Sequence, residues 1–460
     1  MNRIYSFLVL FLLSFSSMAQ TGTGEARFSL KEAVDYAVKN NLDVKNTDVD
    51  RRVALARKGQ VRAAGLPQIN GNVDFTHNIN IQRTVLEYGA SPLFQPDATH
   101  PKGTPTSIAF GLHNQSTPNI TASQVLFDPA FFSSVHAARI YQDLSSKNVT
   151  RSKIETAHNV TKAYYAVLVN QKQLAYLEVN LARLDSSYLE TRARLQNGLA
   201  RQIELDRIEV SYNNLKEEKA RVERVVQLSK ALLKFQMNLP SDTTVTLTDD
   251  LNSDVLTTIV QMPGEGSKKY YGDRIEYRIS QTQLALSKID TRVARGSRYP
   301  KLSAFAAYGY TTAATDPAQI FKFQKDRWFN YSYIGVRLQV PIFNGFSAYY
   351  RVQEKKLEEE RAQNNLRHLE HNIDIQVEES IINFNNSIES LRIQKRNLDL
   401  AEKNLQVLKA EFEQGISMSL DVTVAEAALK EAQTNYYNSV YNALLSKSDY
   451  DRATGVLFKE

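Results

Sequence analysis

Residues 174–200 read LAYLEVNLARLDSSYLETRARLQNGLA and carry the clearest structural pattern in the chain. Mostly apolar residues recur in it at steps of three and four, at Leu174, Leu177, Leu181, Leu184, Tyr188, Thr191 and Leu195. This spacing averages 3.5 residues and is typical of a coiled-coil seam. After Gly198 the spacing restarts, at Leu205, Ile208, Tyr212, Leu215, Lys219, Val222 and Val226. A glycine between two such runs predicts an antiparallel helical hairpin, because glycine readily adopts the left-handed conformation that ends a helix.

The hairpin pattern occurs a second time, 217 residues later. Gly198 shifts onto Gly415, and Asn238 shifts onto Gly455. The second seam comprises Leu391, Gln394, Leu398, Ala401, Leu405, Leu408 and Phe412, then Val422, Ala425, Leu429, Ala432, Tyr436, Ser439 and Ala443. We therefore expect an internal two-fold repeat with one helical hairpin in each half.

The first nineteen residues have the pattern of a cleavable signal peptide. Arg3 precedes an apolar core, and Ser17-Met18-Ala19 is a small-x-small cleavage site. The apolar core is too short for an ordinary transmembrane helix. We therefore expect export.

Composition excludes several classes of protein. The formal net charge is only +6, which gives no electrostatic footprint for nucleic acid. Cysteine is absent, so the chain has no disulfides, no thiolate metal ligands and no cysteine for an N-terminal lipid. No stretch after the signal reaches eighteen apolar residues, so a β-barrel is the remaining way to cross a membrane.

Residues 69–81 alternate strictly between apolar and polar side chains. Ile69, Val73 and Phe75 fall on one parity, and Asn70 and Asn72 on the other. This length suits a tilted transmembrane strand, which needs about 9 to 11 residues. A long strand of a soluble β-sandwich is the alternative.

The first repeat is expected to span residues 28–240. Ser29 and Glu32 have the spacing of a capping box at a helix start. The expected elements are a helix at 29–64, strands at about 69–81 and 108–125 around an exposed loop at 83–107, a long helix at 130–196, and a return helix at 202–237. A connector at 241–272 follows, which we expect to pack beside the helices.

The second repeat is expected to span residues 273–455. Its expected elements are a helix at 274–298, strands at about 301–312 and 328–342, a long helix at 349–413, and a return helix at 420–453. A helix over 130–196 is about 100 Å long at 1.5 Å per residue. The shorter helices at 29–64 and 202–237, placed end to end, match that length.

The expected fold is therefore mostly α with a β-barrel portion: long antiparallel coiled-coil hairpins forming an α-barrel, plus four transmembrane strands per chain. Four strands cannot close a membrane barrel, because the smallest have about eight. Three copies with twelve strands are the economical solution, and rings of two or four copies satisfy the same arithmetic.

Several short motifs, in order and partly duplicated, resemble the TolC-like outer-membrane efflux proteins over nearly the whole mature length. They are Phe28-Ser29-Leu30-Lys31-Glu32-Ala33 with Asn40-Asn41, Gly65-Leu66-Pro67, Val340-Pro341-Ile342-Phe343-Asn344-Gly345, Leu420-Asp421-Val422, and Ala453-Thr454-Gly455. The resemblance implies a homotrimer with a twelve-stranded barrel in outer-membrane lipid and a helical tunnel in the periplasm. It also implies the exit duct of a tripartite efflux or type I secretion system, working with a periplasmic adaptor and an inner-membrane pump of RND, ABC or MFS type.

Two acids follow the hairpin glycines at the same distance. Glu204 comes six residues after Gly198, and Asp421 six residues after Gly415. The resemblance implies that Asp421 lines the periplasmic aperture, and we expect Glu204 to join it, although Val424 replaces the family's further acid. The alternative is that both acids stabilise the positive ends of their helices and face solvent.

The hairpin tips themselves resemble the adaptor-docking tips of the family. They are Asn197, Gly198 and Leu199 in the first hairpin and Gln414, Gly415 and Ile416 in the second. The simpler interpretation is that the turn requires glycine. Both hold together if the turn exposes Leu199 and Ile416.

Aromatic residues near the third and fourth strands suggest an interfacial girdle: Trp328, Tyr331, Tyr333, Tyr308 and Tyr310. Ordinary strand propensity is the alternative. His368 and His371 are three apart on a helix, but without further ligands we expect no metal site. No catalytic or nucleotide-binding motif is present, so we expect neither an enzyme nor a cofactor.

Two other functions compete with the duct. A periplasmic adaptor also combines helical hairpins with β-structure, but the doubled hairpin and the membrane-length strands argue against it. A structural coiled coil without a pore leaves the alternation at 69–81 unexplained. The substrate cannot be read from these residues.

Overall fold

The computed structural model describes residues 25–251, 270–322, 324 and 326–457. The chain divides into two compact units. We call the first the helical unit (Met1–Arg52, Leu144–Gln281 and Asn364–Glu460) and the second the sheet unit (Val53–Asp143 and Thr282–Gln363). Each unit takes segments from both expected repeats. The expected signal peptide, residues 1–19, lies outside the described residues.

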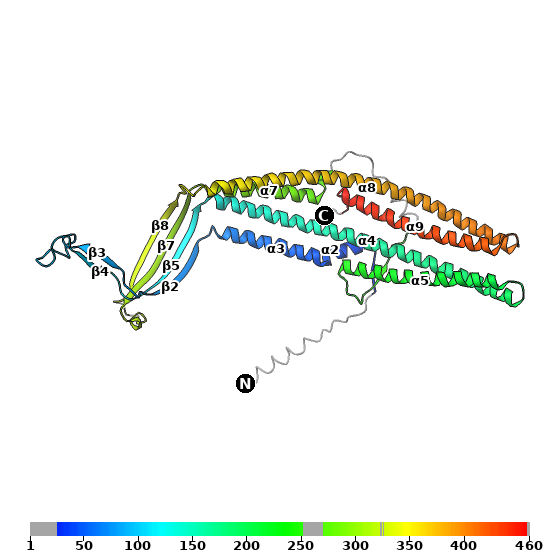
Figure 1. Cartoon of the computed structure of the whole chain (residues 1–460), viewed down its shortest axis with the longest axis horizontal. Coiled ribbons are helices and arrows are strands. Elements are labelled where there is room, and N and C mark those ends of the chain that lie inside the picture. Colours follow the sequence, from blue (N-terminus) through cyan, green and yellow to red (C-terminus); the bar gives the residue numbers. More distant parts are fainter. Residues whose placement is uncertain (1–24, 252–269, 323, 325, 458–460) are drawn as a thin grey trace, which may run out of the picture. The chain divides into compact units, whose positions relative to one another are not determined.

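The long helices follow the expected order (Figure 1). The helices are α2 (Leu30–Asn40), α3 (Leu42–Ala63), α4 (Pro129–Gln196), α5 (Gln202–Met237), α7 (Ile275–Gly296), α8 (Ser347–Glu413) and α9 (Ser419–Ala453). The bounds of α4, α5, α8 and α9 differ from the expected ones by two residues at most. Among the described residues, none of the helices has an apolar segment long enough to span a membrane.

The expected helix over 29–64 is interrupted, and Asn41 is the cause. The Ser29–Glu32 capping box that starts α2 is present. Asn41 then has extended ψ (137°), which separates α2 from α3. Its Nδ2 donates to the carbonyl oxygen of Gln236 at 2.8 Å, and its Oδ1 accepts from the backbone N–H of Asp43 at 2.8 Å. The Asn41 side chain thus caps the new helix and ties it to α5.

A short parallel strand pair, absent from our expectations, covers the end of the first hairpin. β1 (Glu25–Phe28) pairs with β6 (Thr244–Leu247), so the expected connector contains a strand. Residues 252–269 of that connector lie outside the described residues. Asp249 Oδ2 accepts from the N–H of Leu30 at 2.8 Å and from the hydroxyl of Tyr164 at 2.9 Å. These bonds hold the N-terminal segment against α4.

The sheet unit contains an antiparallel sheet of four strands in the order β2-β5-β7-β8 (Figure 1). The strands are β2 (Gln68–His77), β5 (Asn114–Phe127), β7 (Lys301–Ala314) and β8 (Phe329–Gln339). Both outer strands, β2 and β8, have one partner each among the described strands. The sheet therefore has two open edges.

Three expectations in this unit are wrong. The strand expected at 69–81 ends at His77, and the one expected at 108–125 is divided into β4 (Pro105–Ala109) and β5. The stretch 83–107, expected as a loop, contains β3 (Arg83–Glu87), which pairs with β4 in a separate sheet. Gly111, at φ +125°, lies in the bend that separates β4 from β5. Alternation indicates extended backbone, but it does not indicate where one pairing partner is exchanged for another.

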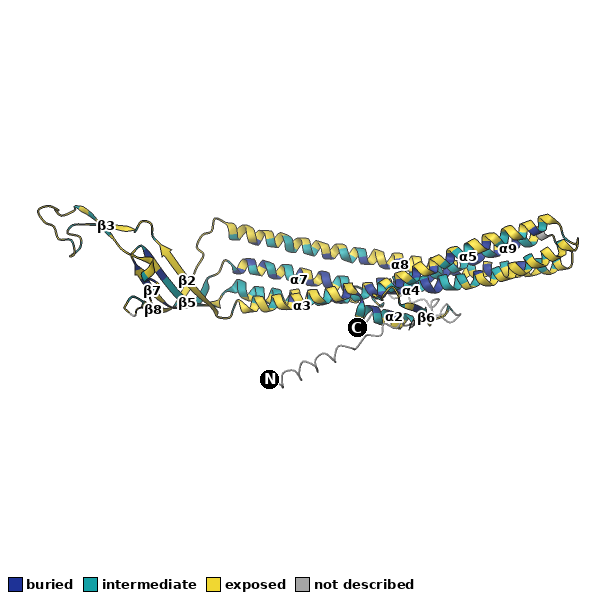
Figure 2. Cartoon of the chain, turned by 90° about the horizontal axis from the view of Figure 1, so that it is seen from below, coloured by how far each residue is buried: buried dark blue, intermediate teal, exposed yellow. Residues whose placement is uncertain are grey.

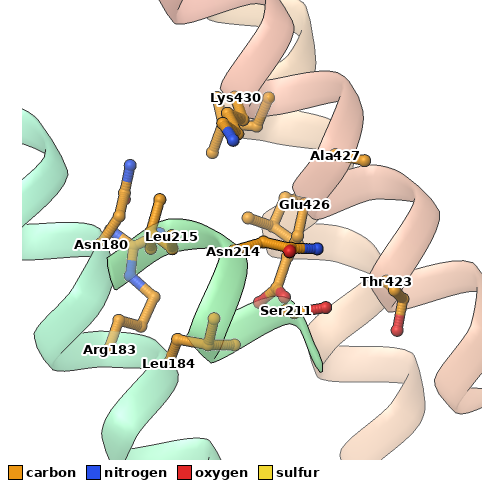
Figure 3. A pocket seen from close by; sticks show the side chains of 12 residues that line it. Asn180, Arg183, Leu184, Ser211, Asn214, Leu215, Thr423, Glu426, Ala427 and Lys430 are labelled. Atoms are coloured by element: carbon orange, nitrogen blue, oxygen red, sulfur yellow. The ribbon is translucent and has the colours of Figure 1, made fainter. Parts of the chain in front are cut away.

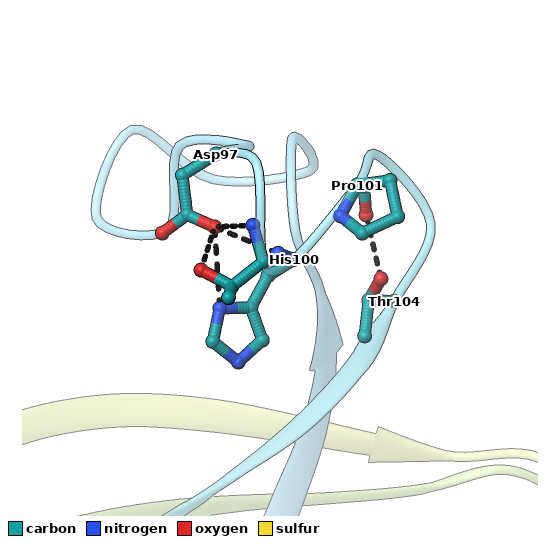
Figure 4. A network of polar contacts seen from close by, with 5 residues as sticks. Asp97, His100, Pro101 and Thr104 are labelled. Atoms are coloured by element: carbon teal, nitrogen blue, oxygen red, sulfur yellow. Dashed lines mark hydrogen bonds and ion pairs between the residues drawn. The ribbon is translucent and has the colours of Figure 1, made fainter.

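In the segment between β3 and β4, one carboxylate oxygen accepts several local hydrogen bonds (Figure 4). Asp97 Oδ1 accepts from the backbone N–H of Thr99 at 2.9 Å and from that of His100 at 2.7 Å. The backbone hydrogen bond from His100 is the largest of the contributions that lower the pKa of Asp97. The ring of His100 stacks on Tyr88, with centroids 4.7 Å apart. This segment is therefore an ordered extension of the sheet unit.

The strand register separates an apolar from a polar face, because directly opposed residues share a face. The mainly apolar face comprises Ile69, Gly71, Val73 and Phe75 of β2, Pro118, Ile120 and Ala122 of β5, Ala306 and Tyr308 of β7, and Ile334, Val336 and Leu338 of β8, together with the polar residues Ser116, Gln124, Thr312 and Ser332. The apolar side chains on β2 and β8 are exposed: Ile69 by 71%, Val73 by 77% and Ile334 by 87%. Figure 2 colours most of β2 and β8 as exposed. The opposite face carries Asn70, Asn72, Asn119 and Arg337.

One buried histidine connects the two hairpins of the helical unit. The side chain of His158 on α4 is 4% exposed, and its Nε2 lies 3.2 Å from Asp449 Oδ1 on α9. Its Nδ1 lies 3.1 Å from the Ser448 hydroxyl, which donates to it in the neutral ring. Burial is the main cause that lowers the pKa of His158 to about 4. The positive charges of Arg452 and Lys162 also lower this pKa, whereas the negative charge of Asp449 raises it.

Acid is therefore expected to destabilise the helical unit through His158. Between pH 6.5 and 4 the unfolded state binds a proton that the folded state does not, so stability falls as the pH falls through this window. Lowering the pH from 7 to 5 should cost about 2 kcal/mol through this residue. Thermal unfolding across this range measures it. His158→Gln should flatten the pH dependence, whereas His371→Gln, at an exposed site on α8, should not; equal slopes in both variants would contradict this prediction.

Candidate functional site at the hairpin tips

Two coiled-coil seams position the tips of the helical hairpins. The seam between α4 and α5 buries Leu177, Leu184, Leu215, Val222 and Val226. The seam between α8 and α9 buries Leu398, Leu405, Ala425 and Leu429. Figure 2 shows these seams as buried and intermediate residues along the paired helices. Both seams contain the residues that the heptad spacing indicated.

The same backbone motif closes both hairpins. At the first tip, Gly198 (φ +74°) donates to the Leu195 carbonyl at 3.0 Å, and Leu199 N–H donates to the Arg194 carbonyl at 2.8 Å. At the second, Gly415 (φ +77°) donates to Phe412 at 3.0 Å, and Ile416 donates to Glu411 at 2.9 Å. This pair of bonds is the Schellman motif, which needs a left-handed residue after the helix.

The opposite ends of the return helices also share this motif. Asn238 (φ 55°) donates to Phe235 at 3.0 Å, and Leu239 donates to Lys234 at 2.9 Å. Gly455 (φ 79°) donates to Arg452 at 3.1 Å, and Val456 donates to Asp451 at 2.8 Å. Left-handed residues thus occur at equivalent positions of the two hairpins, because Gly198 and Gly415, and likewise Asn238 and Gly455, are 217 residues apart.

The tips expose the apolar residues that follow each glycine. Leu199 is 78% exposed and Ile416 is 71% exposed. Asn197 Nδ2 donates to the Ala193 carbonyl at 2.9 Å, so that side chain extends the helix end. Gln414 is exposed. Each tip therefore presents a large apolar side chain beside a tightly bonded turn, and the second tip also exposes Met418 by 73%.

Each expected aperture acid has a local partner. Glu204 Oε1 accepts from Arg201 Nε at 3.1 Å, and Arg201 is itself 81% exposed. Asp421 Oδ2 accepts from the N–H of Met418 at 3.0 Å, which places a carboxylate at the start of α9. Among the described residues, no hydrogen bond or ion pair joins Glu204 to Asp421. The helix-end role of Asp421 is therefore present whether or not it also lines an aperture.

A cavity between the two hairpins, with a mixed apolar and polar lining, was missed by sequence reasoning. Figure 3 shows side chains of α4 and α5 facing those of α9 around this cavity. The cavity has a volume of about 220 Å³. It is lined by Asn180, Arg183, Leu184, Ser211, Asn214, Leu215, Leu405, Thr423, Glu426, Ala427, Leu429 and Lys430. Polar residues flank both seams in the sequence, but the spacing does not indicate which of them meet.

Two direct hydrogen bonds join the hairpins near this cavity. Asn180 Nδ2 donates to Gln433 Oε1 at 3.0 Å, and the Tyr176 hydroxyl donates to Glu402 Oε1 at 2.7 Å. Burial raises the pKa of Tyr176, and the bond to Glu402 adds to that effect, so the hydroxyl stays protonated. On the second hairpin, Lys409 pairs with Glu426 at 2.8 Å. The two hairpins are therefore held in one arrangement by polar contacts.

The five aromatic residues expected to form a girdle do not share one face of the sheet. Tyr308 and Tyr310 lie on the apolar face, with their hydroxyls 3.0 Å apart. Tyr331 is opposite Gly309 and Tyr333 is opposite Ala307, which puts both on the other face. Trp328 precedes β8. A single band of all five is therefore wrong, because alternate residues of a strand point to opposite faces.

Comparison with known proteins agrees with this architecture. The model of the family described as outer membrane efflux protein matches residues 33–237 and 279–456. Outer membrane protein TolC of Vibrio cholerae is 22% identical over 433 residues, which are 94% of this chain and 92% of that protein.

Solved structures show the same fold. A structure of CusC has a TM-score of 0.74 and 17% identity, covering 93% of this chain and 92% of that one. The MtrE outer membrane channel of Neisseria gonorrhoeae has a TM-score of 0.70 and 16% identity, covering 93% and 88%. With its family model matched in both halves, the chain belongs to the outer membrane efflux protein family.

Proposed function

We propose that this outer membrane efflux protein is the exit duct of a tripartite efflux or type I secretion system. The observation that carries the proposal is the sheet β2-β5-β7-β8, whose apolar face is exposed on its two outer strands, β2 and β8. Exposed apolar area of this kind is unfavourable in water, and bilayer hydrocarbon removes that cost. Tyr308 and Tyr310, on the same face, are the members of the expected girdle that remain suited to the lipid interface.

The open edges of the sheet support closure between copies. β2 and β8 each lack a second partner among the described strands, and the four strands alternate in direction. β8 of one copy therefore meets β2 of the next in antiparallel orientation. Three copies make a twelve-stranded barrel, within the known range, and every strand edge is then paired.

The two hairpins supply the wall of a periplasmic tunnel. The left-handed residues 217 positions apart support an internal two-fold repeat, in which each half contributes one hairpin. Three chains then place six hairpins around one axis. The duct receives substrate from an RND, ABC or MFS pump through a periplasmic adaptor. A cleavable signal peptide delivers the chain, and the barrel rather than a lipid anchors it in the outer membrane.

Asp421 and Glu204 are proposed to line the periplasmic aperture. Six carboxylates near one axis attract cations and are screened by salt. Asp421 is exposed and Glu204 is half-buried, so both reach solvent. The N–H of Met418 and the guanidinium of Arg201 fix their directions.

Conductance of the reconstituted protein tests both the duct and this aperture. The wild type should form a cation-preferring pore that multivalent cations block. Asp421→Asn with Glu204→Gln should weaken that block roughly tenfold, which is about 1.4 kcal/mol.

The amides in these variants keep a hydrogen-bond acceptor for Met418 and Arg201, so the change isolates charge from helix capping. Asp97→Asn, an exposed acid in the sheet unit, is the matched control and should leave block unchanged. A pore with unaltered block in the double variant would contradict the aperture, and no pore in the wild type would contradict the duct.

The tips are proposed to dock the adaptor. Leu199 and Ile416 are exposed beside turns whose backbone hydrogen bonds are internally satisfied, so a partner helix gains apolar burial at little conformational cost. Asn197, Gly198, Gln414 and Gly415 shape these turns.

Charged substitutions at the tips should uncouple the duct from its pump. In the native host, Leu199→Asp with Ile416→Asp should abolish efflux, measured as accumulation of a panel of dyes and toxic compounds, while pore formation in bilayers persists. Leu93→Asp is the matched control, because Leu93 is 81% exposed in the sheet unit. Normal efflux and normal adaptor cross-linking in the double variant would exclude docking at these residues.

A further inference from the structure

Two histidines meet where the β2–β5 ladder ends. His77 is the last residue of β2, and His113 directly precedes β5. Their ring centroids are 6.2 Å apart, and the ring planes are inclined by 27°. The pair lies in the sheet unit, far along the sequence from the hairpin tips.

The hydrogen bonds of Asn114 fix the tautomer of His77. Asn114 is 1% exposed, and its Nδ2 donates to the carbonyls of Ala314 at 3.3 Å and Thr315 at 2.8 Å. Its Oδ1 therefore faces His77 Nδ1, at 2.7 Å. Because an amide oxygen only accepts, Nδ1 of His77 carries the proton.

His113 has the same tautomer for an independent reason. Its Nδ1 lies 2.9 Å from the backbone carbonyl oxygen of Asn78, which also only accepts. The N–H of Asn78 donates to the His113 carbonyl at 2.6 Å, so the backbone holds this pairing. Both neutral rings thus keep an unprotonated Nε2, and neither Nε2 has a hydrogen-bond partner among the described residues.

This arrangement is the one that metal-binding imidazoles require. A ligating histidine characteristically donates its other ring N–H to a carbonyl or carboxylate, which orients the ring and raises its basicity. An imidazole nitrogen lies about 1 Å from the ring centre and bonds a metal at about 2 Å, so two rings that share one ion have centroids at most about 6.5 Å apart. The observed 6.2 Å is within this limit.

We propose that His77 and His113 together bind one divalent transition-metal ion through their Nε2 atoms, with water in the remaining positions. Ring centroids 6.2 Å apart require the two Nε2 atoms to lie nearly opposite each other across the ion, which suits tetragonal Cu²⁺ and Ni²⁺ rather than tetrahedral Zn²⁺, and Cu²⁺ should bind most tightly. The site is separate from the proposed aperture and goes beyond the exit-duct function. It also differs from His368 and His371 on α8, for which no acceptor orients the rings among the described residues, and it revises the expectation of no metal site.

The test uses the full-length protein purified in detergent without a polyhistidine tag. Isothermal titration with Cu²⁺ should show one site per chain lost in the double variant His77→Ala, His113→Ala. Pulsed electron paramagnetic resonance should show two imidazoles bound to that ion. Each single variant should weaken binding roughly tenfold or more.

Two further variants separate ligation from folding and from other histidines. His77→Gln keeps a side-chain donor for Asn114 but lacks the ligand, so it should also lose the two-imidazole signal. His368→Ala with His371→Ala removes as many histidines elsewhere and should leave the signal and affinity unchanged. Wild-type binding in the His77, His113 double variant, or loss of binding in the His368, His371 variant, would overturn the proposal.

Discussion

The four-stranded sheet has an exposed apolar face and two open edges, among the described strands, that must both be covered. Ile69, Val73 and Ile334 lie on that face and are more than two-thirds exposed. Backbone groups at an open edge cost several kcal/mol each in hydrocarbon unless they are paired. We therefore propose that strands of further copies pair with the two open edges of this apolar sheet. Each half of the chain contributes two of the four strands, β2 and β5 from the first and β7 and β8 from the second.

The helical hairpins also cover their apolar side chains and pair their backbone groups, but they do so within one chain. Their seams bury leucine and valine at heptad spacing, and their ends are closed by backbone bonds around Gly198 and Gly415. Polar contacts such as Asn180 with Gln433 then fix how one hairpin lies against the other. Asp421 also stabilises the start of α9, because its carboxylate accepts a hydrogen bond from the backbone N–H of Met418. A charge at the entrance and a cap at a helix start are thus compatible roles of one carboxylate.

Much of this was predictable because the governing patterns are local. Heptad spacing placed the ends of α4 and α5 within one residue, and glycine marked both tips. Strand parity indicated the apolar face. The same alternation, applied to the aromatic residues, places Tyr331 and Tyr333 on one face of the sheet and Tyr308 and Tyr310 on the other, as the strand register does.

The missed features depend on contacts between residues far apart in the chain. Asn41 breaks a helix because it bonds Gln236, 195 residues away. The strands β1 and β6 are four residues each, too short for a period to be detected. The tautomers of His77 and His113 follow from the β2–β5 register and from the bonds of Asn114 to Ala314 and Thr315, none of which a single sequence displays.

Disulfide cross-linking between β8 and β2 tests the central claim most directly, and the absence of native cysteine removes any background. Val73→Cys on β2 would be combined in turn with Ile334→Cys, Val336→Cys and Leu338→Cys on β8, with each single cysteine as the control. Oxidation in the membrane should link at least one combination into a covalent species that stops at three chains. Cross-links that end at two chains, that extend beyond three, or that never form would contradict a sheet closed by three copies.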